Sequence, residues 1–215
     1  MTLAGTEQVV VSSSGSVDGY DTKTGDLLWT FDEVGGNTVA SPYPVGDDSF
    51  LIGASPGRNG ENSDGAKQSN LRMRVIQNGG KFQTEVVWRN TEATSSFGSP
   101  IAYRGLAYYT NRAGVLYCID MESGEKVYTE RLGHSNWATP VGIGDRVYIF
   151  GKSGEGTVIK SGREFKVVAD NHLWAVADGG GRGGPPGRGG EILYGFAVVA
   201  EGFIVRTGTR LIAIQ

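Results

Sequence analysis

Short apolar runs of strand length recur along the whole chain. They contain β-branched and aromatic residues and are bounded by Gly, Asp, Asn or Ser; examples are Val9-Val10-Val11, Leu27-Leu28-Trp29, Phe50-Leu51-Ile52, Val86-Val87-Trp88, Ala107-Tyr108-Tyr109 and Val147-Tyr148-Ile149. Such runs are typical of β-strands. The nearest candidate for a helix runs from Phe165 to Ala177, but its valines and its tryptophan favour a strand. The pattern therefore predicts an all-β protein.

A short motif marks the start of a repeated unit. A small residue, a Ser or Thr and a Pro stand together at Ala40-Ser41-Pro42, Gly98-Ser99-Pro100 and Ala138-Thr139-Pro140. A strand, a tight turn and a second, aromatic-rich strand follow each copy. A further copy without the Pro begins at Tyr194. The unit is about 40 residues long, and two copies carry insertions.

A second signature lies later in the unit, where Asp, then Thr or Ser, then Gly precede an aromatic residue. It reads Asp21-Thr22-Lys23-Thr24-Gly25 before Trp29, and Asp120-Met121-Glu122-Ser123-Gly124 before Tyr128. The polar side chains can bond to the turn backbone, and Gly takes a positive φ, which is typical of a hairpin. One unit cannot bury the aromatic ring alone, so we expect the ring to dock on the neighbouring unit. We assign this structural role to Trp29, Trp88, Tyr128, Gly25 and Gly124.

A unit of about 40 residues with four short strands is typical of a propeller blade. The sequence therefore predicts one β-propeller domain over 1–215 with about four to five four-stranded blades. We place the blades at 1–34, 39–92, 97–133 and 137–175, with a partial blade of three strands at 192–215. Insertions interrupt the repeats at 53–70 and 178–191. We expect the first to be a solvated loop and the second, which is rich in Gly, to be a flexible linker.

Composition and charge exclude several classes of protein. The chain has 215 residues, of which 35 are Gly and 7 are Pro, and its net charge is −3. This balance argues against a basic face for nucleic acid, and no apolar run reaches the length of a membrane helix. Cys118 is the single cysteine, so there is no disulfide framework. The N-terminal stretch lacks the basic and apolar pattern of an export signal.

The two signatures together resemble the PQQ-like (pyrroloquinoline quinone-type) β-propeller repeat. The last strands, Phe203-Ile204-Val205-Arg206-Thr207-Gly208-Thr209-Arg210-Leu211-Ile212-Ala213-Ile214, resemble the closing segment of bacterial proteins similar to the BamB outer-membrane assembly factor family. The resemblance implies a ring of seven or eight blades and a place in the periplasm or cell envelope. We expect this chain to be a C-terminal portion of such a ring, open or incomplete. Its open blade edges would then pair with missing blades or with another chain.

The same superfamily contains quinoprotein dehydrogenases, so a fragment of such an enzyme is an alternative. The resemblance implies that those enzymes hold the quinone between a tryptophan floor and two adjacent cysteines, with a calcium ion and an aspartate base. Here Cys118 stands alone, and Trp29 and Trp88 are at docking positions. The two histidines, His134 and His172, are too few for a zinc site. The sequence therefore predicts no catalytic residue, no metal site and no cofactor.

The loops that enter each blade contain the candidate ligand-binding residues. In a propeller these loops gather on one face around the central channel, where polar and aromatic groups can form a site. The candidates are Asn37, Thr38, Ser96, His134, Asn136 and Trp137. A second interpretation is that the polar residues only cap turns and Trp137 only packs between blades. The first interpretation favours a non-catalytic scaffold for a protein, a peptide or a small ligand. A sensor domain of a larger extracytoplasmic receptor is a further alternative.

Overall fold

Five antiparallel sheets follow one another along the chain in the computed structural model, which describes residues 1–36, 38–57, 59–174 and 191–214. The first two sheets are β1 (Thr2–Leu3), β2 (Thr6–Ser12), β3 (Val17–Asp21) and β4 (Leu27–Phe31), then β5 (Tyr43–Val45), β6 (Ser49–Ile52), β7 (Leu71–Asn78) and β8 (Lys81–Arg89). The third and fourth are β9 (Ile101–Tyr103), β10 (Leu106–Thr110), β11 (Val115–Asp120) and β12 (Lys126–Arg131), then β13 (Val141–Ile143), β14 (Arg146–Phe150), β15 (Glu155–Lys160) and β16 (Val167–His172). The fifth has three strands, β17 (Leu193–Val199), β18 (Gly202–Thr207) and β19 (Leu211–Ile214).

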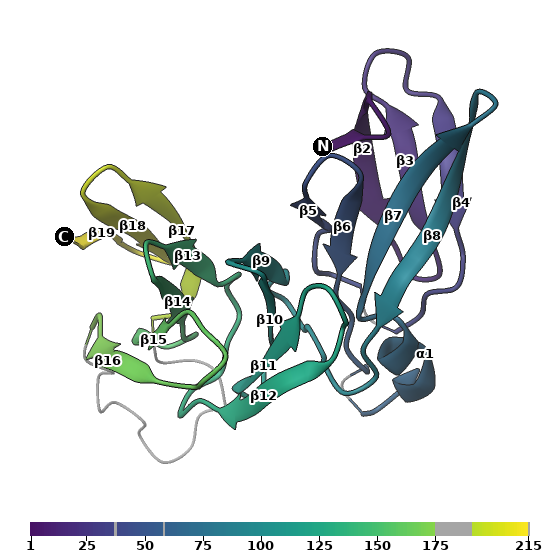
Figure 1. Ribbon diagram of the computed structural model, residues 1–215. Helices are drawn as coiled ribbons and strands as arrows, with labels where there is room; N and C mark the ends of the chain where they lie inside the picture. Colours follow the sequence, from purple (N-terminus) through teal and green to yellow (C-terminus); the bar gives the residue numbers. More distant parts are fainter. Residues whose placement is uncertain (37, 58, 175–190, 215) are drawn as a thin grey trace.

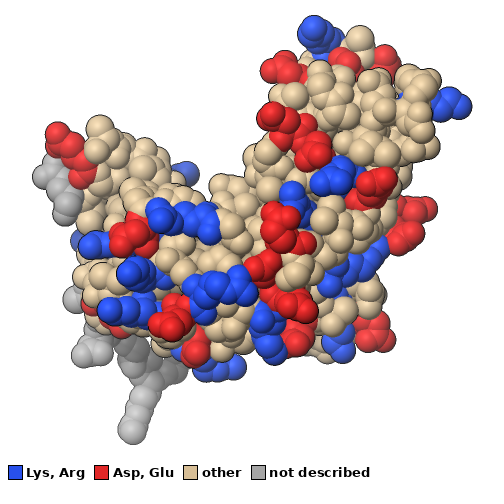
Figure 2. Space-filling model, viewed as in Figure 1, with Lys and Arg blue, Asp and Glu red and all other residues tan. Residues whose placement is uncertain are grey.

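The sheets are the blades of an open arc (Figure 1). Each is a meander in which consecutive strands pair, with β1, β5, β9, β13 and β17 on the inner side of the arc and the last strand of each sheet on the outer side. The first and fifth blades form two separate arms with open space between them (Figures 1 and 2). Acidic and basic side chains are mixed over the face in Figure 2. The prediction of an all-β propeller built from four-stranded blades is confirmed.

The insertion after β6 differs from the solvated loop that the sequence suggested. It contains a short helix, α1 (Ser63–Gln68), in which Ala66 is fully buried. Asn70 holds the insertion in place, since its side chain accepts a hydrogen bond from the Ala54 N–H and donates one to the Ala66 carbonyl, at 2.9 and 2.8 Å. Ala66 packs directly on Gly36, where a Cβ would lie 2.7 Å from the Ala66 Cβ. The polar composition of the insertion gave no sign of this anchoring, because only a few of its residues make the anchoring contacts. The Gly-rich insertion was predicted at 178–191. Its residues 178–190 lie outside the described residues.

The buried apolar side chains of the described residues form four clusters, and each cluster lies between two neighbouring blades. Leu3, Trp29, Phe50 and Met73 belong to the cluster between the first and second blades, and the next two blade pairs are built in the same way. The fourth cluster joins Phe150 of the fourth blade to Phe203 of the fifth, with ring centroids 5.2 Å apart. A single blade buries little apolar surface by itself. The hydrophobic effect therefore stabilises the contact between neighbouring blades.

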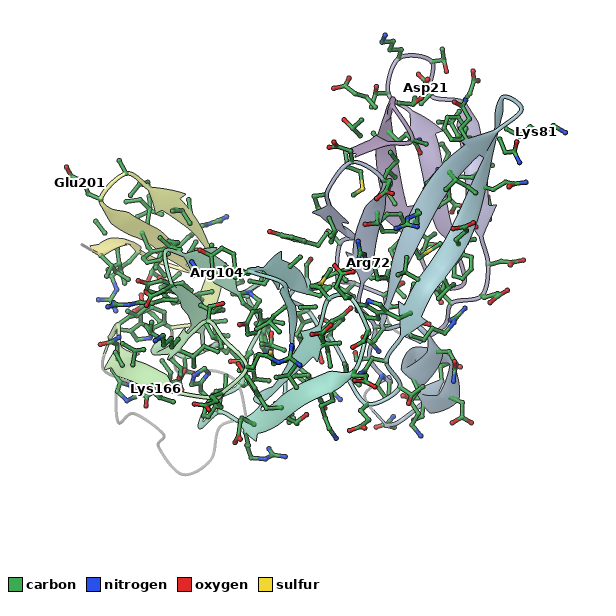
Figure 3. All side chains as sticks on the ribbon, in the orientation of Figure 1. Asp21, Arg72, Lys81, Arg104, Lys166 and Glu201 are labelled. Carbon is green, nitrogen blue, oxygen red and sulfur yellow. The ribbon has the colours of Figure 1, made fainter. Side chains whose placement is uncertain are left out.

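The junction between the second and third blades centres on the turn that follows β11. The Trp88 indole N–H donates to the Met121 carbonyl at 2.9 Å, and Arg72 donates to the same oxygen at 3.0 Å. Asn90 donates to the Gly124 carbonyl at 3.0 Å. Figure 3 places Arg72 between these two blades. Trp88 therefore packs on the signature turn of the next blade.

The two other predicted docking aromatics lie at different junctions. Trp29 lies across Gly19 of its own blade, stacks on Phe50 of the second blade at 6.0 Å, and donates its N–H to the Gln8 side chain at 2.6 Å. Tyr128 meets the Phe165 ring of the fourth blade at 5.7 Å. Each ring thus contacts the following blade, although only Trp88 contacts a signature turn.

The Ser/Thr-Pro motif also links one blade to the next. The Ser41 N–H donates to the Ser99 hydroxyl, and the Ser99 N–H donates to the Thr139 hydroxyl, both at 2.9 Å. The small residue before the hydroxyl gives the neighbouring backbone room, since a Cβ at Gly98 would lie 2.5 Å from the Ala138 carbonyl oxygen. These bonds form a ladder from blade to blade along the inner strands.

Replacement of Gly124 tests the blade junction directly. Gly25 and Gly124 have similar positive φ values of 77° and 74°, but only at Gly124 does a Cβ meet a neighbour, 2.5 Å from the Trp88 ring. Gly25→Ala should cost about 1 kcal/mol from backbone strain. Gly124→Ala should cost about 2 kcal/mol more, because the ring must move. Chemical unfolding of both variants measures the difference, and equal losses would contradict the junction.

Candidate functional site

One face of the arc gathers the loops that enter each blade and the loops between its second and third strands. Helix α1 lies in one of these loops, between β6 and β7. The residues that flank the undescribed stretch also lie here: the Leu173 N–H beside Trp174 donates to Gly154, and Glu191 pairs with Arg210. The signature turns, by contrast, lie on the opposite face, as does Lys81 at the tip of the β7–β8 hairpin (Figure 3). We refer to the first face as the loop face.

Two of the sequence-predicted ligand residues are engaged within the loop face itself. The Thr38 hydroxyl donates to the Ser13 carbonyl at 2.6 Å. The Ser96 hydroxyl accepts the Arg112 N–H at 3.1 Å, and Ser96 is buried. These contacts match the interpretation in which Thr and Ser tie loops together. Asn37, another candidate, lies outside the described residues.

Trp137 is the candidate that reaches the surface. It is 37% exposed, whereas the other tryptophans, at 29, 88 and 174, are all below 9%. Its ring contacts Phe97 of the preceding blade entrance, with centroids 4.9 Å apart. The Lys152 ammonium lies 4.4 Å from the centroid of the Trp137 ring, a distance that gives a cation–π attraction. Aromatic surface and positive charge therefore meet at one place, which we call the Trp137 platform.

His134 lies beside the platform in a chain of hydrogen bonds. The Thr157 hydroxyl donates to the Asp170 carboxylate at 2.8 Å, so it accepts from the protonated Nε2 of His134 at 2.9 Å. This assignment leaves Nδ1 of His134 as a bare acceptor, and Nδ1 has no hydrogen-bond partner in the described part of the chain. Asn136 is 1% exposed, and neither atom of its amide has a hydrogen-bond partner among the described residues.

Burial lowers the pKa of His134 below its ordinary value of 6.5. The nearby Glu155, Asn136 and Asp170 act in the opposite direction, but desolvation of the imidazolium is the larger effect. The cation is disfavoured because the protein around the ring displaces the water that would solvate an imidazolium. The folded protein therefore holds His134 neutral at pH 7.

Several of these partners were not predicted from the sequence. Phe97, Lys152, Thr157 and Asp170 were not candidates, although a signal for one of them exists. Phe97 and Trp137 each stand three residues before the motif Pro, and Val39 has the same place in the second blade. Comparing this position between repeats finds the aromatic pair. The contacts of Lys152, Thr157 and Asp170 join separate strands and loops, so the repeat pattern contains no sign of them.

A groove between the fourth and fifth blades also escaped the sequence. It has a volume of about 570 Å³, and its wall is mostly apolar; Tyr148, Val158, His172, Phe203, Ile212 and Ile214 are among the residues that line it. It lies beside β19, which is the last strand of the three-stranded sheet. In the other four sheets a fourth strand occupies the corresponding place.

Within the described ranges, no three His, Cys, Asp or Glu side chains gather closely enough to hold a metal ion. The helix in this part of the chain is also too short to cross a membrane. Cys118 is fully buried, and burial raises the pKa of its thiol to about 12. A thiol with such a pKa stays protonated and is a poor nucleophile.

The pH dependence of stability tests the environment of His134. Its lowered pKa means that the unfolded chain takes up a proton near pH 6.5 that the folded chain resists, so stability should fall as pH decreases through this range. His134→Gln should reduce the loss of stability between pH 7.5 and 5.5, as measured by chemical unfolding at each pH. The exposed His172→Gln is the comparison variant; since His172 is the weakest of the named influences that lower the pKa of His134, its replacement should change the loss much less. An unchanged loss in His134→Gln would contradict the assignment.

The family model described as outer membrane protein assembly factor BamB matches residues 1–163. No curated protein matches the sequence. Among solved structures, Sqt1 from Saccharomyces cerevisiae has a TM-score of 0.62 at 9% identity, over 100% of this chain and 62% of that one. BamB from Moraxella catarrhalis has a TM-score of 0.48 at 12% identity, over 96% of this chain and 67% of that one. The chain thus spans about two thirds of the length of each structure.

Proposed function

Since the chain belongs to the family of the outer membrane protein assembly factor BamB, we propose that it is a non-catalytic β-propeller scaffold that binds a protein or peptide partner. The description of the family names an assembly factor, and such a factor acts on other proteins. We place this chain in the periplasm or cell envelope on the same ground. Fold alone supports many functions, so the proposal also needs a surface that could bind.

The exposed Trp137 platform is the observation that carries this proposal. Most aromatic and polar repeat residues are used in blade junctions, as Trp88 and Ser99 are. Trp137 is the one tryptophan that remains accessible, and it lies on the face that gathers the loops. Exposed Trp is enriched at the energetic centres of protein interfaces. The loop face therefore presents an aromatic side chain that packs on Phe97 and still leaves part of its surface open to a partner.

Site-specific crosslinking tests the scaffold. A photoreactive phenylalanine analogue at position 137 should form an adduct with a protein in the native host, and the same analogue at Lys81 on the opposite face should not. The partner so identified is then purified, and its Kd is measured with the wild-type chain. Trp137→Ala should weaken binding at least about tenfold, as loss of an interface tryptophan does. Equal affinity of Trp137→Ala, or adducts from position 81 alone, would contradict the proposal.

The non-catalytic part of the proposal rests on the chemistry of the candidate groups. Cys118 is the single cysteine in the sequence and is fully buried. The Trp29 and Trp88 rings are enclosed in blade junctions and are not available as a cofactor floor. Titration with pyrroloquinoline quinone and calcium should therefore leave the absorption spectrum of the quinone unchanged. Stoichiometric uptake with a shifted spectrum would instead support a fragment of a quinoprotein dehydrogenase.

Among the described residues no strand pairs with the outer edge of β19, and this edge favours a second mode of binding, in which an extended strand joins the fifth sheet. In the second blade, the outer strand β8 turns Phe82 and Val86 toward the core shared with the first blade. A strand beside β19 would place similar side chains in the 570 Å³ groove. Leu211 at this edge is 73% exposed, and edges of this kind pair readily with added strands.

A peptide with the sequence of β8, Lys81–Arg89, is a suitable probe for this edge. Added in excess, it should slow amide hydrogen exchange in β19 at least about tenfold, because pairing protects the amides. The control peptide carries Phe82→Asp and Val86→Asp, which cannot enter an apolar groove. Unchanged exchange with the first peptide, or equal protection by both, would rule out strand addition at β19.

A further inference from the structure

The ligand that fits the Trp137 platform has a definite chemistry. We propose that the platform recognises an extended peptide in which an acidic residue stands beside an apolar one. The apolar side chain would pack on Trp137 and Phe97, and the carboxylate would pair with Lys152. This inference deepens the proposed function, since it names the class of segment that the loop face binds.

Lys152 has the bonding capacity that a carboxylate needs. Its ammonium lies over the Trp137 ring, and no carboxylate of the described residues lies within 4.0 Å of it. An ammonium group has three donors, and the ring occupies only one side of it. Contact with the ring also removes part of its water shell. A ligand carboxylate would thus meet a cation that is already partly desolvated.

The platform is held in place by the neighbouring loops. The Ser135 hydroxyl donates to the Arg112 carbonyl, and the Lys152 N–H donates to the Ser135 carbonyl, both at 2.7 Å. Asn136 forms a backbone bridge to Gly151, directly before Lys152. The segments that carry Trp137 and Lys152 are therefore tied to each other. Binding of a ligand would therefore cost little free energy for ordering these two segments, which favours binding.

The apolar part of the platform continues along the blade entrances. Val39, Phe97 and Trp137 occupy the same position of three successive repeats, and Val39 is 59% exposed. An extended segment that runs from blade to blade would meet apolar surface at each entrance and the Lys152 charge at the fourth blade. The row favours a peptide of several residues over a compact small molecule.

Single-stranded nucleic acid is the competing ligand class, because aromatic rings with cations also bind bases and phosphates. The platform has one lysine over its ring, and the carboxylates of Glu155 and Asp170 act on His134 beside it. The whole chain is also acidic, with a net charge of −3. These negative charges would repel a polyphosphate more strongly than they would repel a single carboxylate. The charge balance thus favours the peptide.

The test uses a set of labelled hexapeptides in matched pairs. In each pair an apolar residue, Phe, Leu or Pro, stands beside an acid in one member and beside the matching amide in the other. The acid and amide are Glu and Gln, or Asp and Asn. Binding to the full chain is measured by fluorescence polarisation. The acidic member of the best pair should bind at least about tenfold tighter than its amide. Trp137→Ala should abolish this binding. Lys152→Glu should reverse the preference, so that a peptide with Lys in place of Glu binds better.

Controls separate this inference from the scaffold proposal. Lys81→Glu makes the same change of charge on the opposite face and should leave all peptide affinities unchanged. Circular dichroism and the unfolding midpoint show whether each variant is folded. If no peptide binds, if acid and amide members bind equally, or if an oligothymidylate binds in their place, the inference is wrong. The scaffold proposal fails separately, when Trp137→Ala leaves the affinity of the crosslinked partner unchanged.

Discussion

The hydrophobic core of this chain depends on the contact between neighbouring blades. Each sheet is small, and its apolar side chains complete a core only when the next sheet covers them. Stability is therefore shared along the arc, as expected for a repeat protein in which each unit contacts only its neighbours. The junctions also set the position of the loops, because a loop moves with the blades that it connects.

The repeat motifs are the parts from which the junctions are built. Ser and Thr before the motif Pro give hydroxyl oxygens to the backbone of the preceding blade. Gly124 leaves space for Trp88, whose N–H then reaches the turn at Met121. Motifs of this kind recur because every junction poses the same packing problem. They explain the architecture and are neutral with regard to activity.

Binding is best sought among residues that the blade junctions leave partly exposed. Trp137 stands at a repeat position yet remains accessible, and Lys152 lies over its ring. His134 shows the opposite case, since its bonds to Thr157 and Asp170 make it part of the internal structure. The same loop thus contains one residue that serves the fold and one that is available to a partner. The exposed edge of β19 is a separate surface, and it is defined by backbone groups rather than by a side-chain cluster.

The sequence by itself determined the strands, the turns and the division into blades. Alternating apolar runs and the Asp-to-Gly turns are local signals, and their recurrence near 40 residues indicated a propeller. Only the tertiary structure decided which candidate residues meet: it placed Lys152 on Trp137, linked His134 to Asp170 through Thr157, and buried Ala66 in an insertion that looked solvated. These contacts join residues from different strands or blades, and their distances depend on how the blades pack. The repeat position marks Phe97 and Trp137, but no local pattern encodes the packing that brings Lys152 onto the Trp137 ring, so the complete platform is seen only in the tertiary structure.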